Sequence, residues 1–236
     1  MEKLRILIAC EESQEVCKAF RELGHEAFSC DILPCSGGHP EWHIQEDIFH
    51  FLHGTKRGNW DLIIGHPPCT YLCNSGVSWL YNKDGSKNKE RWKQMERGAL
   101  FFKSLLNQNC EMIAIENPIP HKYALKIIER KYDQIIQPYM FGHPERKATC
   151  FWLVGLPKLK STRNVKKQME KLPKSKSQRI HYTSPGKDRA KIRSKTFKGI
   201  AKAMAKQWSE YLTELNNGND GIPPKPKVLG ILPTII

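Results

Sequence analysis

The chain has 236 residues, of which 39% are hydrophobic and 26% are charged, a composition that suits a single α/β domain with a small appendage. No stretch of 18 apolar residues occurs, so the sequence predicts no membrane span. The first residues run straight into a strand-like segment without a signal-peptide pattern, and 8 cysteines are too few for a disulfide scaffold. We therefore expect reduced thiols and a cytoplasmic protein.

The formal net charge of +14 lies entirely in the C-terminal third of the chain. Residues 1–155 contain 19 Lys and Arg against 19 Asp and Glu, whereas residues 156–236 contain 19 against 5. A basic segment joined to a neutral one is typical of proteins that bind polyanions. We favour nucleic acid as the partner over a lysine-rich surface that only keeps the protein in solution. The candidate contacts are Arg163, Lys166, Lys167 and Arg179.

The N-terminal segment predicts a strand, a helix, a second strand and then an acid. Residues 4–9 form an apolar run, and helical spacing follows between Ser13, the expected N-cap, and Gly24, the expected left-handed residue at the C-terminus. After the second strand at 26–30, Asp31 stands where nucleotide-binding α/β proteins place the acid that accepts hydrogen bonds from ribose. The first turn lacks Gly-x-Gly, so a dinucleotide is disfavoured and a cofactor without phosphates is the better fit.

The Pro- and Gly-rich loop after Asp31 contains residue types that can bind metal. Cys30, Cys35, His39 and His43 could be drawn as a zinc set, but their spacing matches no common finger and a Cys-x-x-Cys knuckle is missing. We therefore predict no metal site.

A thiol follows the third predicted strand on a rigid loop. The apolar residues 62–64 are followed by Gly65 and by Pro67 and Pro68, which fix two successive φ angles just before Cys69. In open α/β sheets, ligands bind beyond the carboxyl ends of the strands. We therefore interpret Cys69 as a functional thiol rather than as a buried cysteine that acts as a small hydrophobe.

A second acid stands at the end of a later strand. Glu116 follows the apolar residues 112–115 and precedes Asn117 and Pro118. An acid at the carboxyl end of a parallel strand would face the same cleft as Cys69. The remaining pattern predicts a helix that begins at residues 47–49, a polar loop at 83–93, and helices at 100–106 and 124–130. It also predicts strands at 134–140 and 149–154.

Composition divides the chain into four parts. Residues 1–155 are the predicted catalytic core, and residues 156–191 form a basic insert with little apolar periodicity. Residues 192–215 show the apolar face of a helix that would close the core, and 216–236 form a tail rich in Gly, Asn and Pro. The insert would be a minimal nucleic-acid recognition region.

These motifs together resemble the cytosine-5 DNA methyltransferases, which use S-adenosyl-L-methionine, and in particular a compact type encoded by phages. The strand leading into Pro67-Pro68-Cys69 resembles the family's catalytic loop, and Ile115-Glu116-Asn117-Pro118 resembles its Glu-Asn-Val motif. The resemblance implies a Rossmann-like class I methyltransferase fold, a mostly parallel sheet with helices on both faces, plus a small basic insert and a C-terminal helix. It also implies a location in a bacterial or phage-infected host cell.

The resemblance implies roles for individual residues. Cys69 would be the nucleophile, with its pKa lowered by nearby cations, and Glu116 would hold a proton against ring nitrogen 3. Arg146 would contact the carbonyl oxygen of a cytosine flipped out of DNA. The cofactor contacts would be Cys10, Glu11, Asp31, Ile32, Asp47, Ile48 and Pro67, and Asn117 and Lys147 would add contacts to nucleic acid.

The sequence departs from the family pattern in three places. Residues 9–13 replace the family's glycine-rich turn. Thr70 and Cys73 stand where the family has Gln and Ser, and Arg146 and Lys147 stand in for two arginines. The first of these departures puts the usual cofactor turn in question.

Three other functions stay open at the level of sequence. One is a non-catalytic nucleic-acid-binding protein on a methyltransferase fold, which the lost glycine turn favours. A second is an RNA methyltransferase with the same Cys69 and Glu116, because a minimal insert need not read duplex DNA. The third is an amino-group methyltransferase, although those enzymes have Tyr or Phe where Cys69 stands.

Overall fold

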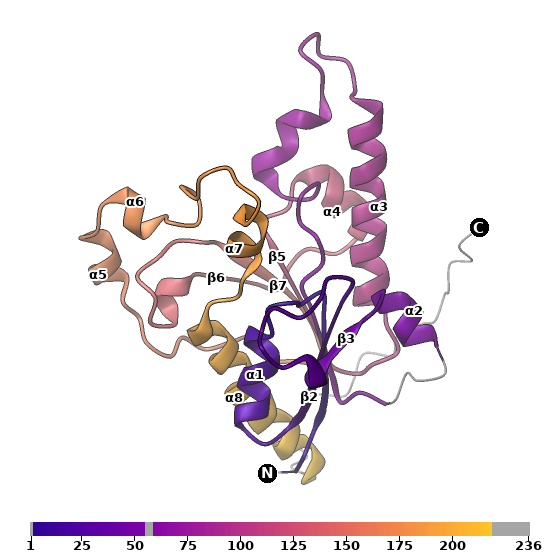
Figure 1. Cartoon of the computed structure of the whole chain (residues 1–236), viewed down its shortest axis with the longest axis vertical. Coiled ribbons are helices and arrows are strands. Elements are labelled where there is room, and N and C mark those ends of the chain that lie inside the picture. Colours follow the sequence, from indigo (N-terminus) through magenta and orange to yellow (C-terminus); the bar gives the residue numbers. More distant parts are fainter. Residues whose placement is uncertain (1, 55–58, 219–236) are drawn as a thin grey trace.

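The computed structural model describes residues 2–54 and 59–218 (Figure 1). A seven-stranded sheet has the order β3-β2-β1-β4-β5-β7-β6. The first five strands in this order pair in parallel, and β7 is antiparallel to its neighbours β5 and β6. The strands are β1 (Arg5–Ala9), β2 (Glu26–Asp31), β3 (His43–Gln45), β4 (Leu62–Gly65), β5 (Ile113–Pro118), β6 (Gln134–Ile136) and β7 (Thr149–Val154). This topology confirms the expected α/β fold with a mostly parallel sheet.

Helices cover both faces of the sheet (Figure 1). One face carries α1 (Glu15–Glu22) and α8 (Lys198–Asn216), and the other carries α2 (Ile48–His53), α3 (Lys89–Leu106) and α4 (Lys122–Ile128). Side chains alternate along β1 between the two layers, with Ile6 and Ile8 under α1 and α8 and with Leu7 in the α3 layer. Three short 3-10 segments complete this part: η1 (Pro40–Trp42), η2 (Asn74–Leu80) and η3 (Pro138–Met140).

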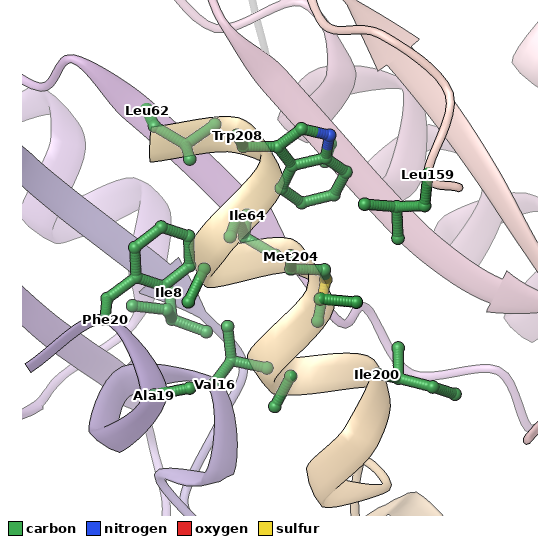
Figure 2. Close-up of a cluster of buried hydrophobic side chains, with 14 of the residues drawn as sticks. Ile8, Val16, Ala19, Phe20, Leu62, Ile64, Leu159, Ile200, Met204 and Trp208 are labelled. Atoms are coloured by element: carbon green, nitrogen blue, oxygen red, sulfur yellow. The ribbon is translucent and has the colours of Figure 1, made fainter. Parts of the chain in front are cut away.

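The core between α1, α8 and the sheet is shown in Figure 2. Phe20 of α1 and Met204 and Trp208 of α8 are fully buried against Ile8 and Ile64 of the strands. The Trp208 indole N–H donates to the Pro157 carbonyl at 3.1 Å, so its polar atom is satisfied inside the core. The predicted C-terminal helix with an apolar face is present as α8, but it begins at Lys198, because the chain leaves helical conformation between Ser194 and Lys198.

Two predicted strands end at different residues. β5 extends through Glu116 to Pro118 because those residues pair with β7, so Glu116 lies within the strand and not after it. β6 stops at Ile136, two residues before Pro138, which has no N–H for the sheet and opens η3 instead.

The predicted polar loop at 83–93 is more regular than expected. Tyr81 and Lys87 form an antiparallel bridge, and the Asn82 N–H donates to the Ser86 carbonyl at 2.8 Å. Asn88 then caps α3 by accepting a hydrogen bond from the Arg91 N–H at 3.1 Å. Together with η2, this turn forms a projection at the top of Figure 1.

The basic insert, for which the sequence predicted little apolar periodicity, contains the short helices α5 (Lys166–Glu170) and α6 (Lys174–Ser177), and α7 (Arg189–Ser194) begins near its end. Leu159 and Ile180 are buried in the same core as α8, so the insert is packed onto the main body. Residues 219–236 of the predicted tail lie outside the described residues. No helix in the described ranges is long and apolar enough to cross a lipid bilayer.

Candidate active site

The carboxyl ends of the parallel strands bring the candidate residues to one edge of the sheet. Cys10 follows β1, Asp31 ends β2, His66 follows β4, and Glu116 lies near the end of β5. Because β1 lies between β2 and β4, and β4 lies next to β5, these residues occupy neighbouring positions. The cofactor candidates and the catalytic candidates therefore share an edge.

The turn after β1 adopts a glycine-like backbone without glycine. Cys10 has a φ of 60° and Gln14 a φ of 57°, left-handed values that cost ordinary residues about 1–2 kcal/mol each. The Cys10 N–H donates to the Cys30 carbonyl at 2.7 Å, and the Gln14 side chain donates to the His39 carbonyl at 2.8 Å. The turn therefore adopts left-handed backbone angles without glycine, and it carries the side chains of Cys10 and Gln14.

Glu11 occupies the N-terminus of α1. Its carboxylate accepts from the Val16 N–H at 2.7 Å and the Cys17 N–H at 3.1 Å, and the residue is 4% exposed. Burial raises the pKa of the Glu11 carboxyl, although the charge of His66 and the two N–H groups oppose the rise. Glu11 is thus the capping residue, not Ser13 as predicted, and its side chain is not available to a cofactor. It also fills the place where a helix N-terminus would bind a phosphate.

Asp31 and Asp47 each use one carboxylate oxygen locally. Asp31 Oδ1 accepts from the Leu33 N–H at 2.9 Å, and Asp47 Oδ1 caps α2 by accepting from the Phe49 and His50 N–H groups at 2.9 and 3.1 Å. The Asp31 carboxylate also accepts a hydrogen bond from the Ile32 N–H. Because a carboxylate has about four lone-pair sites, both acids have a fixed orientation and can still accept a hydrogen bond from a ligand.

Electrostatics group these two acids with Cys10. Burial raises the pKa of the Cys10 thiol, and the charges of Asp31 and Asp47 raise it further, so all three lie near one another. Ile32 exposes 69% of its surface beside Asp31, whereas Ile48 is 4% exposed and Pro67 is buried. Of these apolar candidates, Ile32 alone presents an open side chain to a ligand.

The loop that carries Cys69 is tied to both neighbouring strands. The His66 N–H donates to the Ala9 carbonyl at 2.9 Å, and the Asn117 side chain donates to the Pro67 carbonyl at 3.0 Å. Asn117 is 1% exposed, and the contact between its side chain and nucleic acid stays a prediction. Its amide holds the Pro67–Pro68 segment against β5.

The Cys69 thiol does not have the lowered pKa that the resemblance implied. Burial raises its pKa to about 11, with Cys73 and Glu116 adding to the rise and Lys147 opposing it. The cation is present, but the loss of hydration outweighs it. At neutral pH this group is a thiol, and its attack on a carbon atom requires an acceptor for the proton.

His66 was not among the residues singled out from the sequence. Its Nδ1 lies 3.0 Å from Glu116 Oε2, and the two side chains are 9% and 14% exposed. Burial alone would lower the pKa of His66, but the hydrogen bond to Glu116 and the charges of Glu116 and Glu11 raise it. For Glu116, burial alone would raise the pKa, but the hydrogen bond to His66 and the charge of Lys147 outweigh it and lower the pKa. The register of β4 and β5 pairs Gly65 with Ile115, which places His66 beside Glu116. The position of His66 directly after Gly65 at the end of β4 was the sequence signal that could have identified it.

Lys147, and not Arg146, is the cation of this group. The Arg146 side chain is exposed and its Nε lies 3.4 Å from the Met169 sulfur in the insert, so its contact with the base stays a prediction. Lys147 Nζ donates to the Arg193 carbonyl at 2.9 Å and lies close enough to Glu116 to lower its pKa. Both residues lie in the irregular segment before β7, where the Lys147 N–H donates to Gln137 Oε1 at 3.0 Å.

A small cavity adjoins Glu116 and His66. Its volume is about 10 Å³, and Lys147, Thr196 and Phe197 form part of its lining. Such a space holds about one water molecule. His66 Nε2 is buried and has no hydrogen-bond partner among the described residues. A cytosine ring is far larger than one water, so its entry requires the segment between α7 and α8 to move.

The basic candidates in the insert lie on its surface. Arg163, Lys166 and Lys167 are exposed, and Lys166 pairs weakly with Glu170 at 3.8 Å. Arg179 pairs with Glu145 at 3.1 Å and stays half exposed. All four can reach a polyanion in solvent.

The four residues once considered as a zinc set have separate partners. The Cys30 thiol donates to the Glu46 carbonyl, and the Cys35 thiol donates to Gln14 Oε1. His39 lies 3.0 Å from Glu41, and His43 lies 2.8 Å from the Ser29 hydroxyl. Over residues 2–54 and 59–218, no group of three or more His, Cys, Asp or Glu could hold a metal ion.

Comparison with known proteins finds no matching family model and no matching curated protein. Among solved structures, the S. pombe Dnmt2 methyltransferase is similar with a TM-score of 0.40 and 15% identity over 80% of this chain and 62% of that chain. A triple mutant of Spodoptera frugiperda DNMT2 has a TM-score of 0.38 and 18% identity over 70% and 51%. The chain thus spans less than two thirds of either protein, and its function must be argued from its own residues.

Proposed function

We propose that the protein transfers a methyl group from S-adenosyl-L-methionine to carbon 5 of cytosine in DNA through a covalent adduct with Cys69. The proposal rests on the group formed by Cys69, His66, Glu116 and Lys147 at the ends of the adjacent strands β4 and β5. Carbon 5 of cytosine is a weak nucleophile until a thiol adds to carbon 6. That addition needs a sulfur atom and a proton donor in one site, and this group supplies both.

The residues at the ends of β1, β2 and β3 suit a cofactor without phosphates. Asp31 and Asp47 offer carboxylate oxygens, Ile32 offers an apolar face, and Glu11 excludes an anion from the N-terminus of α1. S-adenosyl-L-methionine has ribose hydroxyls, an adenine amino group and a positive sulfonium, and no phosphate. When bound, it supplies the methyl group. Asp31 would accept from the ribose, and Asp47 would accept from the adenine amino group.

The chain's own groups can move the protons that this reaction requires. The Cys69 sulfur forms a bond to carbon 6 while the thiol proton passes to the Glu116 carboxylate, and Glu116 then donates that proton to nitrogen 3. The cytosine ring then carries the electrons that carbon 5 needs to accept the methyl group. After methyl transfer, the carbon 5 proton leaves to water and the bond between sulfur and carbon 6 breaks. Nitrogen 3 returns its proton through Glu116 to the leaving sulfur, so the Cys69 thiol and the Glu116 carboxylate are both restored.

Lys147 and His66 hold Glu116 as an anion in the resting site. Glu116 can therefore accept a proton at the start of the reaction, before it donates one to nitrogen 3. Because the Cys69 pKa of about 11 leaves little thiolate at neutral pH, such an acceptor is needed. His66, Glu116 and Cys69 would then act as one proton-sharing unit.

Mass spectrometry of nucleosides tests this proposal. DNA and RNA would be incubated separately with the protein and adenosylmethionine that carries a deuterated methyl group. We expect labelled 5-methyldeoxycytidine from DNA and no label with Cys69→Ser. Cys110→Ser, which replaces a buried thiol in the turn before β5, should retain activity. Label on an amino nitrogen of cytosine or adenine would contradict the proposal, and label only in RNA would change its substrate.

The closed cavity beside Glu116 favours a second candidate, a nucleic-acid-binding protein without catalysis. A space of about 10 Å³ admits no base unless the Thr196–Phe197 segment moves. Isothermal titration calorimetry separates the two candidates. Binding of adenosylmethionine supports the enzyme, and nucleic-acid binding without cofactor binding supports the alternative.

A further inference from the structure

The projection next to Cys69 presents one unusually exposed tryptophan. Trp79 of η2 is 65% exposed, whereas the other five tryptophans are buried or half-buried. A single exposed apolar residue is ordinary on a protein surface. Trp79 differs because of the residues around it.

Arg91 lies between two aromatic rings of this projection. Its guanidinium carbon is 5.1 Å from the ring centroid of Tyr71 and 5.8 Å from that of Trp79. Its terminal nitrogen also lies near Gly76, which in turn approaches the Thr70 carbonyl. The three side chains thus form a group, Tyr71, Arg91 and Trp79, that begins two residues after Cys69.

The projection is anchored, so the exposure of Trp79 is not a sign of loose packing. The Tyr81 hydroxyl donates to the Tyr123 hydroxyl at 2.7 Å, and the ring centroids of Trp92 and Tyr123 are 4.9 Å apart. The Asn74 N–H donates to the Ile119 carbonyl at 2.8 Å. These contacts fix η2 and the start of α3 to α4 and to the loop after β5, and they leave Trp79 outside.

The charge of the projection fits a polyanion. Residues 83–97 contain six Lys and Arg against three Asp and Glu, a local excess that the zero net charge of residues 1–155 conceals. In Figure 1 the projection lies on one side of the upper sheet edge and the helices α5 and α6 of the basic insert lie on the other. The projection therefore adds a second basic segment to that of the insert.

We propose that Tyr71, Arg91 and Trp79 form a stacking site for a nucleobase next to the target cytosine, on unpaired or locally opened nucleic acid. Aromatic and guanidinium faces stack on any base, and a nearby cation balances the phosphate. The proposal rests on the proposed function because it takes nucleic acid as the substrate. The sequence predicts that the loop around Ser75–Asn88 fills the gap in the DNA or covers the flipped base; the proposal instead assigns the projection to the recognition of the flanking strand.

The test compares two oligomers with the same number of phosphates. Fluorescence anisotropy would measure binding of the protein, without adenosylmethionine, to labelled oligothymidylate and to an abasic oligomer of equal length. We expect the wild type to bind the oligomer with bases about tenfold more tightly. Trp79→Ala should lose most of that preference without weakening binding to the abasic oligomer, and Trp79→Phe should retain part of it. Leu100→Ala, an exposed apolar control on α3, should match the wild type.

Three outcomes would overturn the stacking site. They are equal binding of both oligomers by the wild type, an unchanged preference in Trp79→Ala, and an equal loss on both oligomers. If Trp79→Ala instead reduces self-association with no effect on either oligomer, the group is a protein interface. Because the assay needs no cofactor and no turnover, a failure of methyl transfer leaves its result unaffected.

Discussion

At the scale of single residues, the site is defined by how burial competes with charge. Lys147 lies near Cys69, yet burial keeps the pKa of the Cys69 thiol at about 11. The same cation, together with His66, keeps Glu116 below its ordinary pKa despite burial. A thiol that retains its proton therefore sits beside a carboxylate that lacks one, which is the starting arrangement for a proton transfer.

The pair formed by His66 and Glu116 should stabilise the fold over a defined pH range. The raised pKa of His66 contributes stability below its ordinary value of 6.5, and this is lost as the pH rises through the folded value. The lowered pKa of Glu116 contributes stability above 4.5, and this is lost as the pH falls through the folded value. The coupling should therefore be largest between pH 4.5 and 6.5.

A double-mutant cycle with His66→Asn and Glu116→Gln, followed by urea unfolding, measures this coupling. We expect about 1.5–3 kcal/mol at pH 5.5 and a clear decrease at pH 9. His39 and Glu41 provide a matched control, because their side chains are also 3.0 Å apart but are 40% and 57% exposed. A coupling at His66 no larger than that of the exposed pair, or one independent of pH, would contradict this account.

At the scale of elements, strand ends and helix caps place the side chains. Periodicity predicted β1, β2, β4 and β7 closely, because buried apolar runs depend on local pattern alone. It missed the continuation of β5 through Glu116, because that depends on pairing with β7, which is distant in sequence. It also chose Ser13 as the cap of α1, since nothing local shows that Glu11 folds back onto the Val16 N–H.

The cap formed by Glu11 makes a separate prediction about α1. Glu11→Ala leaves two buried N–H groups without an acceptor and should lower the free energy of unfolding by about 1–3 kcal/mol. Glu11→Gln keeps a carbonyl oxygen and should lose less. Thermal unfolding of both variants measures the difference, and equal stability of Glu11→Ala and the wild type would show that the cap contributes nothing.

Cofactor binding should depend on the carboxylate oxygens of Asp31 and Asp47. Asp31→Asn keeps the Oδ1 acceptor of the turn at Leu33, and Asp47→Asn keeps the Oδ1 acceptor that caps α2. In both variants an NH₂ donor replaces Oδ2. Each substitution should weaken adenosylmethionine binding by about tenfold or more, measured by calorimetry. Glu210→Gln, an exposed acid on α8, is the control. Unchanged affinity in both aspartate variants would remove these residues from the cofactor site.

At the scale of the whole molecule, a neutral α/β body carries a basic insert on one side. The uneven charge was evident from the sequence, because counting needs no structure. That Lys147 rather than Arg146 lies near Glu116 was not evident from the sequence. It depends on where β7 begins and on the position of the Met169 sulfur. The described insert is folded into short helices with exposed cations, so it can contact a polyanion as a surface.

Binding to nucleic acid should therefore weaken steeply with salt. Each phosphate contact contributes about 0.9 to the slope of log affinity against log salt concentration on duplex DNA. Replacing Lys166 and Lys167 by Ala should reduce that slope by up to about 2. Replacing Lys202 and Lys206 on α8 by Ala, with the same change in charge, should leave it nearly unchanged. Equal effects of the two pairs would mean that net charge, and not the insert, binds the polyanion.

The most direct test of the central claim is covalent capture by DNA that contains 5-fluorocytosine. Fluorine replaces the carbon 5 proton that must leave, so the adduct with Cys69 cannot break down after methyl transfer. We expect a complex that requires adenosylmethionine, survives denaturation, disappears with Cys69→Ser, and persists with Cys73→Ser, the neighbouring thiol. Peptide mapping should place the base on Cys69. Capture that survives Cys69→Ser, or no capture by a protein that binds both cofactor and DNA, would contradict the proposed mechanism.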